Sequence, residues 1–131
     1  MALLLKRGHP KCLTVETNGR LPDGTTLSAA IAALETATEG IPLFYGVNCA
    51  HPSHFLGELK GAWLDRIGVV RVNASALSHA ELDEATELDD GDPEDFGRHC
   101  KQMDTLLPNL RVNGGCCGSD CRHIAAAARA M

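Results

Sequence analysis

The sequence predicts an α/β fold in which parallel strands alternate with helices. Four short runs rich in apolar and β-branched residues are each followed by a segment with helical periodicity. The hydrophobic fraction of 44% is sufficient for a core, which alanine, leucine and valine must largely fill because aromatic residues make up only 4% of the chain. A regular alternation of strands and helices implies a parallel sheet with crossover helices.

The first half of the chain contains two strand–helix units. Residues 11–17 (KCLTVET) predict the first strand, and a turn-rich loop follows it. Residues 27–40 predict a helix, because apolar residues recur every three or four positions and Gly40 provides a stop. Residues 41–48 (IPLFYGVN) predict a second strand that runs into a loop, and residues 52–64 predict a second helix with one apolar face.

The second half adds two further units. Residues 67–75 (IGVVRVNAS) predict the third strand, and residues 109–115 predict the fourth. The helix between them has Asp92 as its expected N-cap and Pro93 at its first position, and Pro108 ends it.

The last predicted element is an alanine-rich helix over residues 119–131, with Ser119 as its expected N-cap. The complete order is four strands, each followed by a helix. Such a set forms either a small open α/β sheet or half of an eight-fold barrel, and periodicity does not distinguish the two.

Composition restricts the partners of the chain. Its net charge of −5 argues against nucleic acid, which needs a basic face. No apolar run approaches the roughly 20 residues of a membrane span, and no export signal is evident. We therefore expect a cytoplasmic protein whose six cysteines are reduced. Residues 81–96 hold nine of the seventeen acidic residues, which predicts a solvated loop, the alternative being a loop over the site.

Three of the cysteines follow strands. Cys49 follows the second predicted strand, and Cys116 and Cys117 follow the fourth. In parallel α/β folds, sites are built at the carboxyl ends of the strands, so these side chains can converge. Three thiolates with no obligatory fourth ligand suit a zinc site with an open position.

Glycines surround these cysteines. Gly114, Gly115 and Gly118 would let the backbone bend so that the adjacent cysteine side chains reach one ion, and Gly46 would act similarly before Cys49. The alternatives are simple packing of buried cysteines and a strained vicinal disulfide.

The remaining cysteines and histidines have weaker patterns. Cys121 is expected to pack within its helix, although it could pair with Cys117 as ligands or as a redox couple. We expect Cys12 and Cys100 in the core. The remaining candidates are histidines near the cysteines. His51 and His54 are expected to be solvated or to cap a helix, and metal ligation or a supporting contact to the site is the alternative. His123 is expected to lie in a helix near the site.

Two motifs resemble those of the homocysteine S-methyltransferases. These are GVNC at residues 46–49 and GGCCG at residues 114–118, and they resemble the C-terminal half of that family. The family includes betaine-dependent and S-methylmethionine-dependent enzymes and the homocysteine module of cobalamin-dependent methionine synthase. The segment NGRLPDGTTL (18–27) resembles the loop after its fifth strand. In GCCGSDCRHI, Ser119 stands where threonine is usual and Cys121 where proline is frequent.

The resemblance implies a fold and a site. Residues 1–131 would form a single partial domain, the C-terminal half of a (β/α)8 TIM-type barrel whose full length is roughly 300 residues. Cys49, Cys116 and Cys117 would hold zinc, and the homocysteine sulfur would be the fourth ligand. Asn73 matches an asparagine of the family's seventh strand and is predicted to bind substrate.

The implied reaction transfers a methyl group from a small donor to the zinc-bound homocysteine thiolate and gives methionine. No side chain needs to act as a general base. A half barrel would expose its inner face, so we expect self-association, pairing with an N-terminal half-barrel, or a truncated chain. The alternative function is a non-catalytic zinc-binding half-barrel remnant, and a third hypothesis is a thiol redox protein that uses Cys117 and Cys121.

Overall fold

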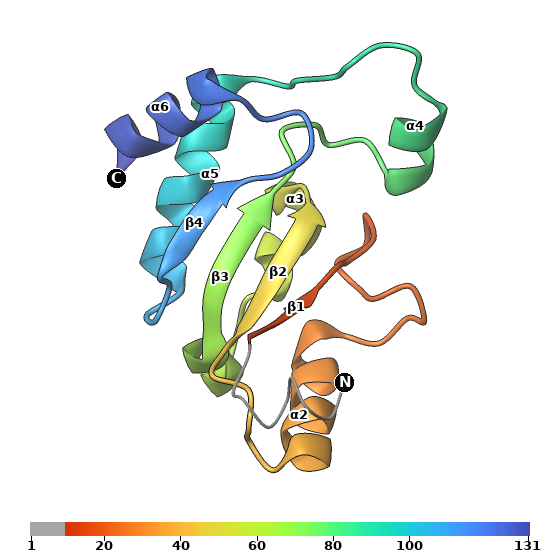
Figure 1. Cartoon of the computed structure of the whole chain (residues 1–131), viewed down its shortest axis with the longest axis vertical. Coiled ribbons are helices and arrows are strands. Elements are labelled where there is room, and N and C mark those ends of the chain that lie inside the picture. Colours follow the sequence, from red (N-terminus) through yellow and green to blue (C-terminus); the bar gives the residue numbers. More distant parts are fainter. Residues whose placement is uncertain (1–9) are drawn as a thin grey trace.

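The computed structural model describes residues 10–131, which form one four-stranded sheet with helices packed along it (Figure 1). The strand order is β1-β2-β3-β4, and every neighbouring pair is parallel. The strands are β1 (Lys11–Leu13), β2 (Tyr45–Ala50), β3 (Ile67–Val72) and β4 (Val112–Gly115).

The connections between the strands are helical. Figure 1 shows α5 and α6 beside β4, while α4 lies away from the sheet on a long connection. The helices are α2 (Leu27–Thr38), α3 (Pro52–Phe55), α4 (His79–Glu84), α5 (Pro93–Leu106) and α6 (Cys121–Ala130), with the 3-10 turns η1 (Leu56–Glu58) and η2 (Ala62–Arg66).

The strand order decides between the two architectures that the sequence allows. In a doubly wound sheet the order reverses at a switch point, whereas in a β/α barrel each strand lies beside the next one in sequence. The four strands here follow the sequential order without a reversal. The predicted α/β class is confirmed, and the arrangement matches part of a TIM-type barrel.

Helix boundaries follow the capping residues. Thr26 accepts a hydrogen bond from the backbone N–H of Ala29 at the start of α2, and Asp92 accepts one from Glu94 at the start of α5. The last helix differs from the prediction, because its N-cap is Asp120 rather than Ser119. The Ser119 hydroxyl instead donates to the carbonyl of Cys116 at 2.7 Å, so it stabilises the turn before the helix.

The predicted continuous helix over residues 52–64 is wrong. This segment forms α3, η1 and η2, and Gly61 between the two 3-10 turns has a φ of +109°. Glycine adopts that conformation readily, and Gly61 stands directly before η2, so the backbone changes direction there. The apolar face survives the break, since Phe55 and Leu59 are both buried. Helix α4, which no prediction included, begins with a capping box between Ser78 and Glu81.

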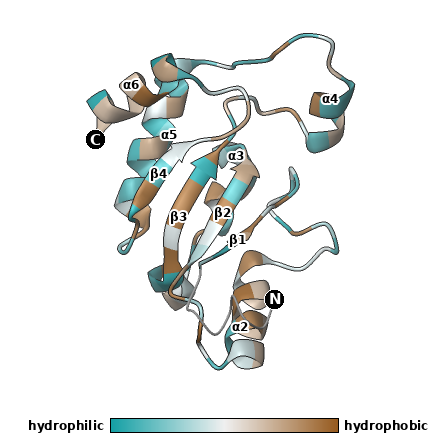
Figure 2. Cartoon of the chain, viewed as in Figure 1, coloured by the Kyte–Doolittle hydropathy of each residue, from teal (hydrophilic) through white to brown (hydrophobic). Residues whose placement is uncertain are grey.

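The core lies on one face of the sheet. Val70 and Val72 of β3 are fully buried and belong to the same hydrophobic cluster as Cys100 and Met103 of α5. Figure 2 shows that β3 is hydrophobic over most of its length, and Arg71, which points to the opposite face, is exposed. Within residues 10–131, this opposite face is therefore only partly covered.

The two cysteines predicted in the core have different environments. Cys100 is fully buried, as expected, and burial raises the pKa of its thiol to about 11. Cys12 is exposed, so its prediction is wrong. Its sulfur lies on the opposite face of the sheet, near Gly46, where an added Cβ would be 3.1 Å from it. The alternation of side chains along a short strand does not reveal which face of the sheet the helices cover, so the sequence could not place Cys12 on the exposed face.

No helix within residues 10–131 has the length and apolar character that crossing a membrane requires.

Adjacent leucines at the end of α5 provide a test of the core. The side chain of Leu107 is 2% exposed and that of Leu106 is 38% exposed. Leu107→Ala should lower the free energy of unfolding by about 2–5 kcal/mol, because it removes buried methyl groups and leaves a cavity. Leu106→Ala is the matched control and should cost less than half as much. Urea denaturation of both variants measures the difference, and equal losses would contradict the assigned core.

Candidate metal centre

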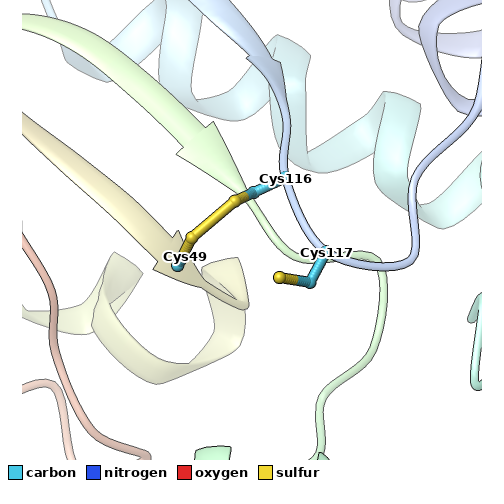
Figure 3. A group of neighbouring side chains, drawn as sticks. All are labelled: Cys49, Cys116 and Cys117. Atoms are coloured by element: carbon cyan, nitrogen blue, oxygen red, sulfur yellow. A yellow bond between two sulfur atoms is a disulfide. The ribbon is translucent and has the colours of Figure 1, made fainter.

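Three cysteine side chains meet at the carboxyl edge of the sheet. Cys49 lies near the end of β2, and Cys116 and Cys117 directly follow β4. One ligand atom of each lies within 4.8 Å of the other two, so the group could hold a metal ion. Figure 3 shows the three side chains on the two strand ends, with the Cys117 sulfur directed toward the other two. The predicted convergence of strands two apart is confirmed.

A β-bulge directs the side chain of Cys49. Asn48 pairs with Arg71 and Ala50 pairs with Val72, so Cys49 has no partner of its own on β3. Its φ of +54° is rare for a residue that is not glycine. Bulges of this kind redirect a side chain at the end of a strand. The side-chain amide of Asn48 donates to the Cys49 sulfur at 3.1 Å.

A tight turn presents Cys116 and Cys117. The N–H of Cys116 donates to the carbonyl of Val72 at 2.8 Å, which extends the pairing of β4 with β3. Gly118 has a φ of +77°, and an added Cβ there would lie 2.8 Å from the carbonyl oxygen of Asp89. The expected need for glycine in this turn is confirmed at Gly118.

The glycines before the cysteines have a different role. At Gly115 an added Cβ would collide with the side chain of Ser119, and at Gly46 it would lie 2.9 Å from the carbonyl oxygen of Val69. Both positions are restricted by close packing. Gly114 has no neighbour within 4 Å of such a Cβ. The expectation that Gly46 bends the backbone before Cys49 is therefore wrong, since the bulge at Cys49 itself does so.

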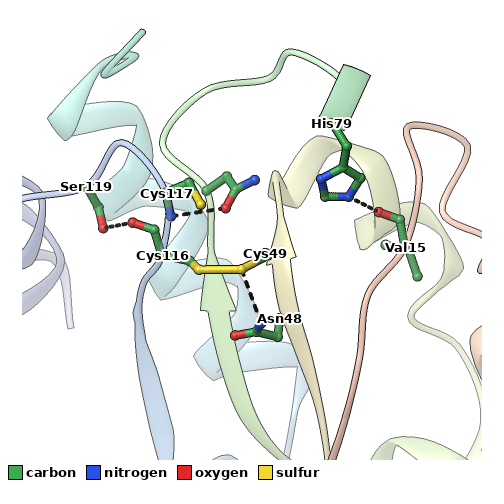
Figure 4. The surroundings of a disulfide bond; sticks show 8 residues. Val15, Asn48, Cys49, His79, Cys116, Cys117 and Ser119 are labelled. Carbon is green, nitrogen blue, oxygen red and sulfur yellow. Dashed lines mark hydrogen bonds between the residues drawn. A yellow bond between two sulfur atoms is a disulfide. The ribbon is translucent and has the colours of Figure 1, made fainter. Parts of the chain in front are cut away.

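Asn73 connects the two halves of the site. Asn73 is only 2% exposed, and its Oδ1 accepts a hydrogen bond from the N–H of Cys117 at 3.2 Å. Figure 4 shows Cys117 beside Cys116 and Cys49 at this edge of the sheet. The Asn73 N–H donates to the carbonyl of Ala50, and Ala74 donates to the carbonyl of Cys117, both at 3.0 Å. Asn73 thus holds the backbone of Cys117 in place. Its predicted contact with substrate stays a prediction.

Cys49 and Cys116 form a disulfide in this structure, with Cα atoms 5.6 Å apart. The expectation that all six cysteines are reduced stays a prediction for this pair, because the same two sulfurs belong to the group that could hold a metal ion. The convergence that makes the group a candidate metal centre also brings the two thiols within bonding reach. The two states exclude each other, since a metal ligand must be a thiolate.

The donor set fits zinc once the pair is reduced. Zinc takes thiolates at about 2.3 Å in tetrahedral geometry, which separates neighbouring sulfurs by about 3.8 Å. The three ligand atoms already lie within 4.8 Å of one another, so reduction requires little movement of the backbone to reach that separation. One tetrahedral position remains for a fourth ligand.

A family model described as Homocysteine S-methyltransferase matches residues 4–131. The chain belongs to the homocysteine S-methyltransferase family. No curated protein and no solved structure matches it. The match spans nearly the whole chain and includes both cysteine-bearing segments, so the three cysteines belong to a member of a methyltransferase family.

A pocket of about 270 Å³ lies beside Cys117. Part of the acidic segment forms its wall, and Asp89 is fixed there because its carboxylate accepts hydrogen bonds from the Ser75 hydroxyl at 2.6 Å and from the N–H of Gly91 at 3.0 Å. Most of residues 81–92 are exposed, as the prediction of a solvated loop requires, and a few of them also border this pocket. The pocket is lined by Asn73, His79, Leu82, Asp83, Leu88, Asp89, Cys117 and Gly118.

The other residues singled out in the sequence lie around this centre. Cys121 is exposed at the start of α6, so the expected packing within its helix is wrong. His123 is fully buried in α6, where its Nε2 lies 2.7 Å from the carbonyl oxygen of Asp90. It thereby connects the last helix to the acidic segment.

His51 caps α3, as expected for a helix-capping histidine, but it is also buried. Burial, and then the nearby His99 and His54, lower the pKa of His51 to about 4. Asp95 and His99 of α5 lie against it, and sequence analysis did not group them with it. Their spacing of one helical turn was the available signal, but it does not reveal which loop the helix packs against.

Removal of the Asn73 side chain tests its structural role. Asn73→Ala should lower the free energy of unfolding by about 1–3 kcal/mol, because the N–H of Cys117 loses its acceptor. Asn109 provides the control: its side-chain amide donates to the carbonyl of Asp65 at an exposed position, and Asn109→Ala should change stability by about 0.5 kcal/mol or less. Urea denaturation under reducing conditions measures both. If Asn73→Ala is as stable as Asn109→Ala, the proposed role of Asn73 in holding the backbone of Cys117 is refuted.

Proposed function

We propose that this chain transfers a methyl group from a small donor to the thiolate of homocysteine and so produces methionine. Cys49, Cys116 and Cys117 would hold the zinc ion that the reaction needs. The proposal is carried by one observation: in a chain whose residues 4–131 match the family model, two strand ends bring three cysteine ligand atoms within 4.8 Å of one another.

Bound zinc would lower the pKa of the substrate thiol, whose ordinary value is about 8.5, so that the thiolate forms at neutral pH. The residues of the chain supply the rest of the site. Three thiolates leave one position for the substrate sulfur. Asn73 fixes the backbone of Cys117, and the bulge fixes Cys49. No side chain acts as a general base, because the metal favours loss of the thiol proton directly.

The pocket beside Cys117 suits the substrates by its charge. Asp83 and Asp89 are among its lining residues, and the Ser75 hydroxyl keeps the pKa of Asp89 below its usual value, so this carboxyl is ionised at neutral pH. Anionic groups next to the thiolate site favour the ammonium group of homocysteine or a cationic methyl donor. The predicted contact of Asn73 with substrate belongs to the same pocket.

The exposed face of the sheet favours a second candidate, a zinc-binding domain that is not catalytic on its own. Arg71 and Val112 are exposed on strands β3 and β4, where a complete barrel would be filled by side chains. In that case an N-terminal half-barrel or a second copy would complete the pocket. The thiolate site requires a reducing compartment such as the cytoplasm.

Serine substitution of one cysteine tests the proposed function. The reduced chain is loaded with Co²⁺ to record the sulfur-to-cobalt charge-transfer band, and then with Zn²⁺ to assay methionine formation from homocysteine with betaine or S-methylmethionine. Cys117→Ser should weaken the charge-transfer band, because two thiolates remain of three, and should reduce activity at least about tenfold. Cys121→Ser, at an exposed cysteine four positions later, should retain both.

The outcomes separate the two candidates. An unchanged charge-transfer band in Cys117→Ser would refute the ligand set. A normal band in the unaltered chain without methionine formation would refute autonomous catalysis and support the non-catalytic candidate. A metal-dependent activity that Cys121→Ser retains and Cys117→Ser loses would support the proposed function.

A further inference from the structure

A second group of metal-ligating side chains lies outside the three cysteines. His51, Asp95 and His99 each offer one ligand atom, and these atoms all lie within 4.8 Å of one another. His51 follows β2, whereas Asp95 and His99 are one turn apart on α5. We propose that these three residues bind a divalent transition metal ion at a second site, distinct from the cysteine centre.

The environment of His51 prepares it for ligation. The residue is 8% exposed, and its Nδ1 lies 2.7 Å from the Ser53 hydroxyl. The N–H of Ser53 also donates to Nδ1 at 3.3 Å, which is the contact by which His51 caps α3. A metal at Nε2 would therefore require the other tautomer, in which Nδ1 donates to the Ser53 hydroxyl and this longer cap contact is lost. Metal-ligating histidines generally make such a hydrogen bond through their other ring nitrogen, because it fixes the tautomer and the ring orientation.

The environment of His99 has an unsatisfied nitrogen. Its Nδ1 is buried and lacks a hydrogen-bond partner among the described residues. The nearest carboxylate oxygen, Oδ2 of Asp95, lies 3.5 Å away, which is longer than an ordinary hydrogen bond. A buried nitrogen without a partner is costly, and a metal ion shared with Asp95 would satisfy it.

Asp95 is the third residue of the group, and Arg98 fixes the orientation of its carboxylate. Oδ1 of Asp95 accepts a hydrogen bond from Arg98 at 2.6 Å, which leaves Oδ2 directed to His99. The rings of His51 and His99 lie with centroids 5.3 Å apart at an angle of 84°, so they approach edge to face rather than stacked. The carboxylate provides one negative charge opposite a divalent ion.

The donor types indicate the class of metal. Two imidazoles and one carboxylate suit Zn²⁺, Co²⁺, Ni²⁺ or Fe²⁺ and leave positions open for water or another ligand. Mg²⁺ and Ca²⁺ prefer oxygen ligands, so two nitrogen donors disfavour them. The cysteine centre, by contrast, offers only sulfur. The two sites therefore differ in the ligands by which they select metals.

Zinc stoichiometry tests the second site. In calorimetric titrations of the full chain under reducing conditions, the unaltered protein should bind two equivalents of zinc. His99→Gln should lose one equivalent, and Asp95→Asn should weaken the same equivalent at least about tenfold. Both variants should keep the sulfur-to-cobalt charge-transfer band, which shows that the fold and the cysteine centre persist.

His54→Gln is the matched control. The His54 ring lies 5.8 Å from that of His51, but the residue is outside the set, and its Nε2 contacts the carbonyl of Ala76 at 2.9 Å. This variant should keep both equivalents. The proposal is overturned if the unaltered chain binds a single equivalent that His99→Gln keeps. It is also overturned if Asp95→Asn and His99→Gln both keep the second equivalent at full affinity, or if His54→Gln loses it equally.

Discussion

Hydrogen bonds at the carboxyl end of β3 position both cysteine-bearing segments. The carbonyl of Val72 accepts from the N–H of Cys116, and Asn73 donates to the carbonyl of Ala50 on the other side while its side chain accepts from Cys117. One short stretch of backbone therefore sets the distance between β2 and the turn after β4. This pairing sets the separation of the three sulfurs. Strands β2 and β4 are two positions apart in the sheet at a fixed spacing, so their side chains can approach one another only at the carboxyl edge, where the strands end.

Much of the fold could be predicted because local signals and tertiary packing agree. The apolar runs became parallel strands, and Asp92 and Pro93 start α5 where capping rules place them. The failures occur where a local signal is ambiguous. Gly61 interrupts a segment whose apolar spacing alone favours a helix. Ser119 and Asp120 are both good N-caps, and the choice depends on a carbonyl of Cys116 that only the folded turn presents.

The candidate site divides in the same way. The positions of Cys49 and Cys116 after strands predicted their convergence, because the carboxyl ends of parallel strands share one edge. The bulge at Cys49 could not be predicted, since it arises from a register shift against β3 that the sequence of β2 does not contain. The grouping of His51 with α5 was equally hidden, because it depends on how a helix more than forty residues later packs against the loop after β2.

Two donor sets of different chemistry near one edge respond differently to oxidation. A disulfide between Cys49 and Cys116 would remove two thiolates from the cysteine centre, and zinc could not then be held by three sulfurs. Imidazole and carboxylate ligands have no such oxidised form under the same conditions, so His51, Asp95 and His99 keep their donors in either state. An oxidised chain would thus retain one metal site and lose the one that the proposed methyl transfer needs. The thiol–disulfide state, rather than the fold, would decide whether the chain can activate a substrate thiol.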